Sequence, residues 1–167
     1  GGIDGSTGLS VTVHKRETYL YKTDIVKTTE GYFTFWFNPN SVNIPDEADL
    51  PIPGKSIRIV DVKGYQHYDV IASLRIWKPR DSGENYKAYL EWQADDGSHF
   101  DLDMGQFNLV NGWQKITLGF RINNWIAVWV NDVLAREVTG IKHSESFGEI
   151  IEFGKANDDT SVTPVGV

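Results

Sequence analysis

The chain has 167 residues, 40% of them hydrophobic and 23% charged, and a formal net charge of −7 at pH 7. This composition is typical of one folded globular domain, and the acidic balance argues against a nucleic-acid partner, because phosphate binding needs a basic surface. The absence of cysteine excludes disulfide scaffolds and thiolate metal sites, and no apolar run is long enough for membrane insertion.

Short runs rich in Val, Ile, Thr, Tyr, Phe and Trp follow one another along the chain, separated by turn-forming residues. Such runs predict β-strands, because branched and aromatic side chains pack well on a pleated sheet, and no stretch has helical periodicity. In chain order the predicted strands are Leu9–Val13, Tyr19–Tyr21, Tyr32–Phe37, Ser56–Val60, Val70–Trp77, Tyr86–Gln93, His99–Met104, Trp113–Ile122, Ile126–Val130, Val133–Val138 and Glu149–Phe153.

These closely spaced strands, with no helix between them, predict an all-β fold, an antiparallel two-sheet jelly-roll sandwich. Residues 8–167 are expected to form a single domain, and residues 1–7 to be a linker or a cloning remnant. Prolines make residues 41–54 an irregular loop in this prediction. The pair Asn131-Asp132 is typical of a two-residue hairpin turn.

The hairpin around Asn123 can form in two registers, and the choice decides which side chains reach the surface. A two-residue turn would mix apolar and polar side chains on both faces, whereas a three-residue turn over residues 123–125 separates them. The separation favours the three-residue turn, because a one-residue slip exchanges the two faces of a strand. Trp129 then lies on the outer face opposite Gly119, and its indole beside a residue without a side chain offers a flat aromatic wall.

An aromatic wall of this kind can bind sugars, because pyranose rings stack on it while neighbouring polar groups bond their hydroxyls. Strand alternation predicts that one aromatic and basic face carries Trp129 together with Arg75, Trp77, Tyr89, Glu91, Lys115 and Arg121. The alternatives are that Trp129 is a core residue and that Trp77 only caps the sandwich. Trp36, Trp92 and Trp113 are expected in the core, because Trp is highly buried on average.

A loop between two predicted strands is the second candidate binding site. It places Tyr65, His67 and Tyr68 at a turn, and loops on a rigid sandwich often carry binding residues. The alternative is that its tyrosines only cover the edge of the sandwich. No cofactor is expected to be required; Asp158 and Asp159 are the candidates for a structural calcium ion, although acidic turns are common without metal.

Paired carboxylates are what a glycosidase would need. Asp101 and Asp103 share one face of their predicted strand, and Glu91 is placed across a hairpin from one of them. A solvated hairpin near a sheet edge is the favoured interpretation, because surface charge is the commoner fate of Asp. The Arg, His and Tyr residues that a lyase would need are scattered, so no enzymatic activity is expected.

Five motifs in order along the chain carry a family resemblance. They are Gly8–Val11, Gly31–Val42, Asn111–Ile116, Ile126–Asp132 and Phe147–Gly154. Together they resemble the concanavalin A-like lectin/glucanase superfamily, in particular its bacterial laminin-G-like non-catalytic domains. The resemblance implies a concanavalin A-like jelly roll and an extracellular module that binds glycans or proteins. The family usually closes with a further strand, for which only Thr160–Val167 remains, interrupted by Pro164. The alternatives are that this tail is a short edge strand, where proline is tolerated, and that the chain has been trimmed.

The residues and the resemblance together predict a non-catalytic carbohydrate-binding module of a larger secreted or cell-surface protein, with a polysaccharide or glycan as partner. The basic face makes anionic glycans a class to test. The alternative is a protein-interaction or adhesion domain without a glycan site, because an unpaired C-terminal edge could accept a strand from another protein domain. A polysaccharide hydrolase or lyase is the least favoured function.

Overall fold

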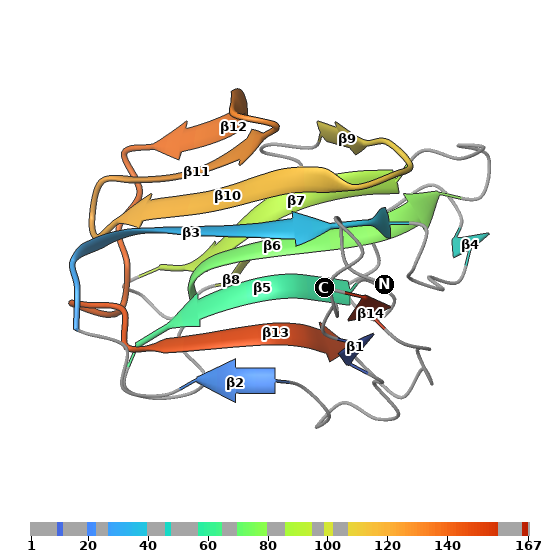
Figure 1. Ribbon diagram of the computed structural model, residues 1–167. Helices are drawn as coiled ribbons and strands as arrows, with labels where there is room; N and C mark the ends of the chain where they lie inside the picture. Colours follow the sequence, from blue (N-terminus) through green and yellow to red (C-terminus); the bar gives the residue numbers. More distant parts are fainter. Residues whose placement is uncertain are drawn as a thin grey trace.

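The computed structural model describes residues 10–11, 20–22, 27–39, 46–47, 57–64, 70–79, 86–94, 99–101, 107–156 and 165–166. Within these ranges the chain is all-β, and two antiparallel sheets face each other as a jelly-roll sandwich (Figure 1), which confirms the predicted fold. The described residues include no helix of the length and apolarity needed to cross a lipid bilayer.

One sheet has four strands in the order β12-β11-β10-β3, and all its pairings are antiparallel. β3 spans Glu30–Phe37 and β10 spans Gln114–Arg121, whereas β11 and β12 span Trp125–Val130 and Val133–Thr139. The turn between β11 and β12 consists of Asn131 and Asp132, with φ angles of 52° and 65°. Positive φ at both positions gives the two-residue hairpin turn that the sequence predicts.

The second sheet has eight strands and follows the order β2-β13-β5-β6-β7-β8. These strands span, in that order, Leu20–Lys22, Ile150–Ala156, Ile57–Lys63, Val70–Pro79, Tyr86–Gln93 and His99–Asp101. Two short strands lie off this path: β9 (Phe107–Leu109) pairs with β7, and β4 (Asp46–Glu47) pairs in parallel with β6. β1 (Ser10–Val11) and β14 (Val165–Gly166) pair with each other.

Every predicted strand overlaps an observed one, and β14 lies in the tail for which a short edge strand is one of the alternatives, whereas β4 and β9 fall outside the prediction. β4 lies within the residues predicted as an irregular loop, and β14 pairs with β1 as a short strand close to Pro164. β4 and β9, of two and three residues, do not lie in an alternating run of the kind by which a strand is recognised in a sequence.

Apolar side chains from both sheets fill the space between them and form the core. Leu118 and Phe120 of β10 and Leu74 and Ile76 of β6 are fully buried there. Trp92 of β7 belongs to the same core, as predicted. Burial of apolar surface is the main favourable term in folding, so this layer fixes how the two sheets pack.

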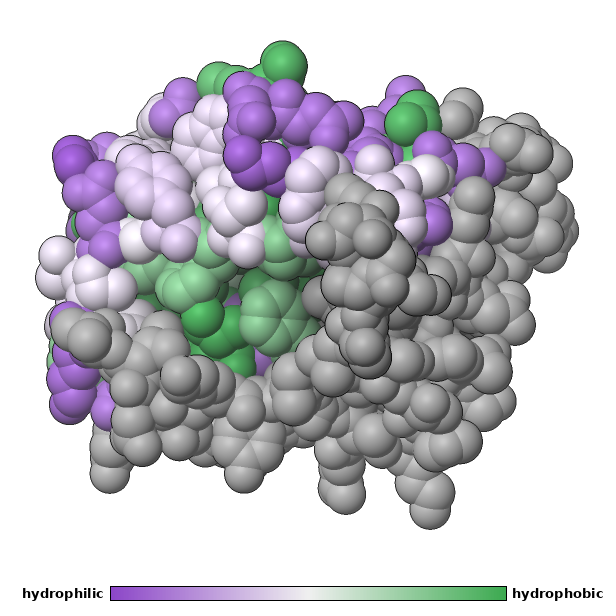
Figure 2. Space-filling view, viewed as in Figure 1, coloured by the Kyte–Doolittle hydropathy of each residue, from purple (hydrophilic) through white to green (hydrophobic). Residues whose placement is uncertain are grey.

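Figure 2 shows apolar side chains between β3 and β13, along one side of the sandwich. Phe35 of β3 and Phe153 of β13 meet edge-on with ring centroids 5.7 Å apart, and both are half-buried. Phe33 is also half-buried and stacks on the core residue Phe120. These rings line the side of the sandwich between the two sheets.

The hairpin between β10 and β11 has the predicted faces but a different pairing. Trp129 pairs with Thr117, so the expectation that it lies opposite Gly119 is wrong. The turn consists of residues 122–124 instead of 123–125. The pairing differs from the prediction by two residues, and a shift of two leaves every side chain on its predicted face.

Candidate functional site

The outer face of the four-stranded sheet, which points away from the core, is the candidate site. Its members follow from the strand register, because alternate residues of a strand point to the same side. Across β3 and β10 they form four successive rows: Glu30 with Arg121, Tyr32 with Gly119, Thr34 with Thr117, and Trp36 with Lys115. On β11, Trp125, Ala127 and Trp129 continue the first three rows.

An aromatic platform, made of Tyr32, Trp125 and Trp129, occupies the middle of this face. The ring centroids of Tyr32 lie 5.8 Å from Trp125 and 5.9 Å from Trp129, and the two indoles are 6.3 Å apart. All three rings reach over Gly119, where an added Cβ would lie 2.9 Å from Trp129 and 3.0 Å from each of the other two side chains. The absence of a side chain at Gly119 therefore lets the three rings converge.

The platform is open to solvent. Tyr32 is 57% exposed, and Trp125 and Trp129 are half-buried. Trp36, the fourth aromatic residue of the face, is 42% exposed, so the expectation that it lies in the core is wrong. These exposed aromatic side chains make the outer face the candidate site, because contiguous apolar surface on a folded protein is characteristic of interaction sites.

Two ion pairs frame the platform. The Arg121 guanidinium donates to Glu30 Oε2 over 2.9 Å from Nε and 2.6 Å from Nη2, and the Tyr32 hydroxyl donates to Glu30 Oε1 over 3.3 Å. At the other end of the face, Lys115 Nζ lies 2.7 Å from Asp132 Oδ1. The prediction of a basic face is therefore wrong, because both Arg121 and Lys115 are paired with carboxylates.

Four of the predicted site residues lie on the second sheet instead. Arg75 and Trp77 belong to β6, and Tyr89 and Glu91 to β7, so the expectation that they share a face with Trp129 is wrong. Each of the four is between 1% and 4% exposed. Trp77 meets Tyr89 edge-on with ring centroids 5.3 Å apart. They are enclosed side chains, whereas Trp129, Lys115 and Arg121 lie on the outer face.

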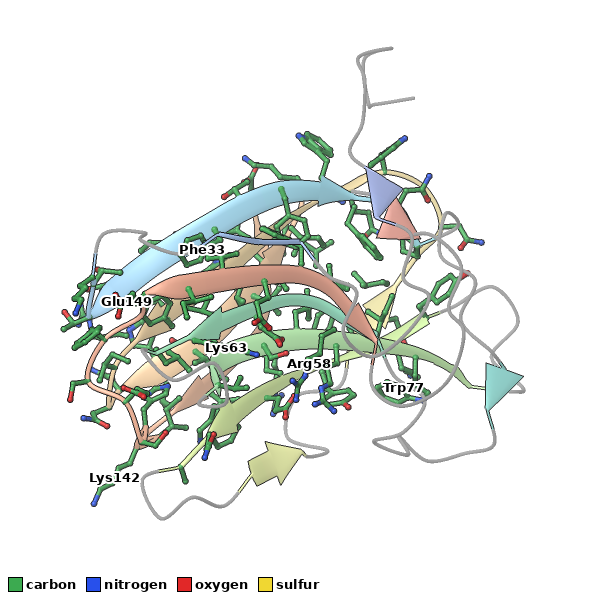
Figure 3. All side chains as sticks on the ribbon, turned by 90° about the horizontal axis from the view of Figure 1, so that it is seen from below. Phe33, Arg58, Lys63, Trp77, Lys142 and Glu149 are labelled. Atoms are coloured by element: carbon green, nitrogen blue, oxygen red, sulfur yellow. The ribbon has the colours of Figure 1, made fainter. Side chains whose placement is uncertain are left out.

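Arg75 and Glu91 belong to a buried ionic face of the eight-stranded sheet. The face is defined by Arg58, Asp61, Lys63, Arg75, Glu91 and Glu152. Figure 3 shows this sheet from below, with Arg58 and Lys63 labelled on β5. Glu91 lies 2.5 Å from Arg75 Nε and 3.0 Å from Arg58 Nη2, and Lys63 Nζ lies 2.5 Å from Glu152 Oε2. Three cations thus offset three carboxylates, as buried charges require.

His143 connects the turn beside the platform to the second sheet. Its Nδ1 accepts a hydrogen bond from the Asn123 N–H over 2.9 Å, and Asn123 Oδ1 accepts one from the His143 N–H over 2.9 Å. Because Nδ1 accepts, Nε2 carries the proton and donates to the Ile71 carbonyl over 3.0 Å. Burial lowers the pKa of His143 from 6.5 to about 4, against the opposing effect of the Ile71 bond. The neutral ring thus joins the turn at Asn123 to Ile71 of β6 by hydrogen bonds.

Several predicted candidates lie outside the described residues: Tyr65, His67, Tyr68, Asp103, Asp158 and Asp159. Asp101 of β8 pairs with Glu91 of β7, which confirms the predicted hairpin neighbours. In the part of the chain that the structure describes, no group of three or more His, Asp or Glu side chains is placed to hold a metal ion.

Sequence reasoning missed Tyr32 and Trp36 as members of the outer face, and it left Trp125 at the tip of a turn. In β3, Tyr32 and Trp36 alternate with three phenylalanines. Once the phenylalanines are assigned to the core, the period of two directs Tyr32 and Trp36 outward, which is the signal that could have found them. Trp113, also expected in the core, is half-buried.

No protein-family model and no curated protein matches this chain. Solved structures do match. The structure HCR/D-Sa-GBL1/C superposes with a TM-score of 0.59 at 11% identity, covering 95% of this chain and 37% of that one. The botulinum neurotoxin serotype G binding domain gives a TM-score of 0.54 at 12% identity, covering 97% of this chain and 39% of that one.

An alginate lyase from Alteromonas sp. 272 also matches, with a TM-score of 0.45 at 9% identity, covering 80% of this chain and 52% of that one, and this looser superposition carries no argument. The chain spans less than two fifths of the length of the first two structures. At these identities the comparisons show the fold alone. It is a β-sandwich of the kind found in a neurotoxin binding domain, and these comparisons do not single out the concanavalin A-like or laminin-G-like group.

Proposed function

We propose that this chain is a non-catalytic carbohydrate-binding module of a larger secreted or cell-surface protein, and that it binds a glycan at the aromatic platform. The observation that carries the proposal is the convergence of Tyr32, Trp125 and Trp129 over Gly119 on an exposed face. Three aromatic rings held in contact with water cost solvation free energy, and a binding partner would recover it by covering them.

The groups around the platform favour a sugar over a purely apolar ligand. A pyranose offers an apolar C–H face for stacking and a rim of hydroxyls for hydrogen bonding. The platform supplies the rings, and Glu30, Arg121 and the hydroxyls of Thr34 and Thr117 supply polar partners beside them. The combination therefore matches both parts of a sugar.

The fold supports a binding role within a larger protein. The similar serotype G structure is a binding domain, and this chain covers 39% of it. The concanavalin A-like and laminin-G-like resemblance of the sequence remains part of the proposal, as does the extracellular location. The proposal of no catalysis is supported by Glu91, whose carboxylate is buried against Arg58 and Arg75 and is not offered to a substrate.

A glycan array and a pull-down on insoluble polysaccharides, each with and without EDTA, test this proposal. We expect the wild-type chain to bind a defined glycan, and Trp129→Ala and Tyr32→Ala each to lower the affinity at least about tenfold, the change that about 1.4 kcal/mol produces. Val110→Ala is the control, because Val110 is 54% exposed and lies off the platform. A blank array, or wild-type affinity in both platform variants, would contradict the proposal.

A protein-interaction domain is the second candidate, and the edge strand β12 favours it. Val133 and Leu134 of β12 are 69% and 49% exposed, and β12 pairs with β11 on one side only within the described sheet. Exposed strand edges can accept a strand from a partner. Concentration-dependent dimerisation in analytical ultracentrifugation, abolished by Val133→Lys, would support this candidate, and a strict monomer would weigh against it.

A further inference from the structure

We infer that the outer face takes an extended, uncharged glycan chain lying along β3, and not a single terminal sugar. The inference rests on the proposed function and adds the size and charge of the ligand. It follows from a second aromatic residue, Trp36, and from the ion pairs at the two ends of the face.

Trp36 is too far from Tyr32 for both side chains to stack on the same sugar. It follows Tyr32 by four residues on the same face of β3. The Cα atoms of the two residues therefore lie about 13 Å apart, because a strand rises about 3.3 Å per residue. A single pyranose ring cannot span that distance. Two exposed aromatic side chains, 57% and 42% accessible, can therefore be covered together only by a chain of rings that runs parallel to the strand.

The surface between the two aromatic positions suits such a chain. Thr34 lies between Tyr32 and Trp36 on β3, and its hydroxyl is 2.9 Å from that of Thr117 on β10. Threonine side chains are small, so the surface between Tyr32 and Trp36 lies below the neighbouring aromatic rings. The two threonine hydroxyls remain near solvent. A continuous track, aromatic at both ends and hydroxyl-bearing in the middle, runs along β3.

The charges of the face favour an uncharged ligand. Arg121 is paired with Glu30 and Lys115 with Asp132, so neither cation faces the track alone. A third carboxylate, Glu137, pairs across β12 and β11 with Ala127 of the same face. The face thus carries more carboxylates than cations on a chain of net charge −7, which disfavours a polyanionic glycan.

The test is isothermal titration calorimetry with oligosaccharides from disaccharide to hexasaccharide. The neutral probes are β-1,4-linked glucose, β-1,3-linked glucose and β-1,4-linked mannose, and the anionic probe is oligomeric alginate. We expect affinity for a neutral series to rise about tenfold between disaccharide and tetrasaccharide, corresponding to about 1.4 kcal/mol, and then to level off. Raising the salt concentration should leave this affinity unchanged, because no net charge is neutralised on binding.

Two substitutions assign the length dependence to Trp36. Trp36→Ala should abolish the gain with chain length while leaving disaccharide affinity as in the wild type, and Trp36→Phe should retain most of the gain because it keeps a ring. Trp129→Ala should weaken binding at every length. Val110→Ala, which changes an exposed apolar residue off the platform, is the matched control and should behave as wild type.

The outcomes separate this inference from the proposed function. Platform-dependent binding on the array to a terminal sugar or an anionic glycan, with no length dependence in any neutral series, would overturn the inference and leave the proposed function standing. Equal loss in Trp36→Ala at all lengths would also overturn it. No platform-dependent binding to any glycan would overturn both.

Discussion

The two sheets of the sandwich each carry aromatic and charged side chains on the face turned away from the core, but the two faces meet opposite conditions. On the four-stranded sheet, Tyr32 and Trp36 are 57% and 42% exposed, and each of two cations has one carboxylate partner near water. On the eight-stranded sheet, the buried ionic face matches three cations to three carboxylates, and all of them except Arg58 are at most 2% exposed. Burial, and not residue type, thus separates a surface open to a ligand from a structural layer.

The largest effect on the free energy of unfolding is expected from a substitution of Glu91 in the buried ionic face. Glu91→Gln removes the carboxylate between Arg58 and Arg75 and leaves two guanidinium groups without their shared anion. Removing one partner of a buried ion pair costs about 3–5 kcal/mol, because the remaining charge stays away from water. We expect a loss of this size in the free energy of unfolding, measured by urea denaturation.

Glu137→Gln is the matched control, because Glu137 is an exposed carboxylate on the four-stranded sheet. Its free energy of unfolding should stay within about 0.5 kcal/mol of wild type. Equal effects of the two substitutions would show that the ionic face is not buried in solution.

The next effect sharpens the comparison at His143, which links the two sheets through Asn123 and Ile71. Burial lowers its pKa to about 4 in the folded chain, against 6.5 when unfolded. Below pH 6.5 the unfolded chain therefore binds a proton that the folded chain does not, so the stability from the neutral ring is complete above pH 6.5 and is lost as the pH falls toward 4.

This proton linkage amounts to about 3 kcal/mol across that pH window. Urea denaturation at several pH values should show the loss in the wild type, and His143→Gln should lack this contribution because glutamine does not titrate. Parallel pH profiles for the two proteins would contradict the assignment. Carboxylates titrate in both proteins and therefore cancel in the difference.

The strands along the chain and the faces of most of their side chains could be predicted from the sequence, because both follow from a period of two; Trp36, expected in the core, is an exception. The order of the strands within each sheet does not follow from that period. The turn after β10 was placed wrongly, since a shift of two residues preserves the faces and the apolar pattern cannot detect it. In the observed turn Asn123 has a left-handed φ of 55°, a conformation that asparagine tolerates.

The candidate site was predicted only in part, because alternation tells which face a side chain takes but not what covers that face. Arg75 and Glu91 were correctly directed away from the core, yet they are buried. The convergence of three rings over Gly119 depends on strand neighbours far apart in sequence, such as Tyr32 and Gly119. The glycine beside Trp129 indicated a flat aromatic wall but not its other members.

A smaller effect on stability, with a large effect on binding, is expected at Gly119. Gly119→Ala adds a Cβ within 3.0 Å of all three rings of the platform, so the rings must move apart. Crowding of this kind costs about 1–3 kcal/mol, and the lower end applies here because the ring edges can move toward solvent. Glycan affinity, measured by calorimetry, should fall about tenfold or more, since the flat surface is lost.

Removing one ring provides the control for this interpretation. In the double variant Gly119→Ala with Trp125→Ala, one of the three close contacts of the new Cβ is removed and those with Trp129 and Tyr32 remain. The combined loss of stability should therefore be smaller than the sum of the two separate losses. Strictly additive costs would mean that the rings do not crowd Gly119.

The smallest effect on the free energy of unfolding is expected at Asp132, because its ion pair is exposed whereas the ion pairs of Glu91 are buried. Asp132→Asn removes the ion pair between Asp132, whose side chain is 71% exposed, and Lys115, whose side chain is 35% exposed. Asparagine tolerates the φ of 65° that Asp132 has in the turn. An exposed ion pair contributes less than about 1 kcal/mol, so the free energy of unfolding should change by no more than that. Binding of a neutral oligosaccharide should be unchanged, because Asp132 lies at the margin of the face. A loss as large as that in Glu91→Gln would mean that pairing, and not burial, determines how much a charged side chain contributes to the free energy of unfolding.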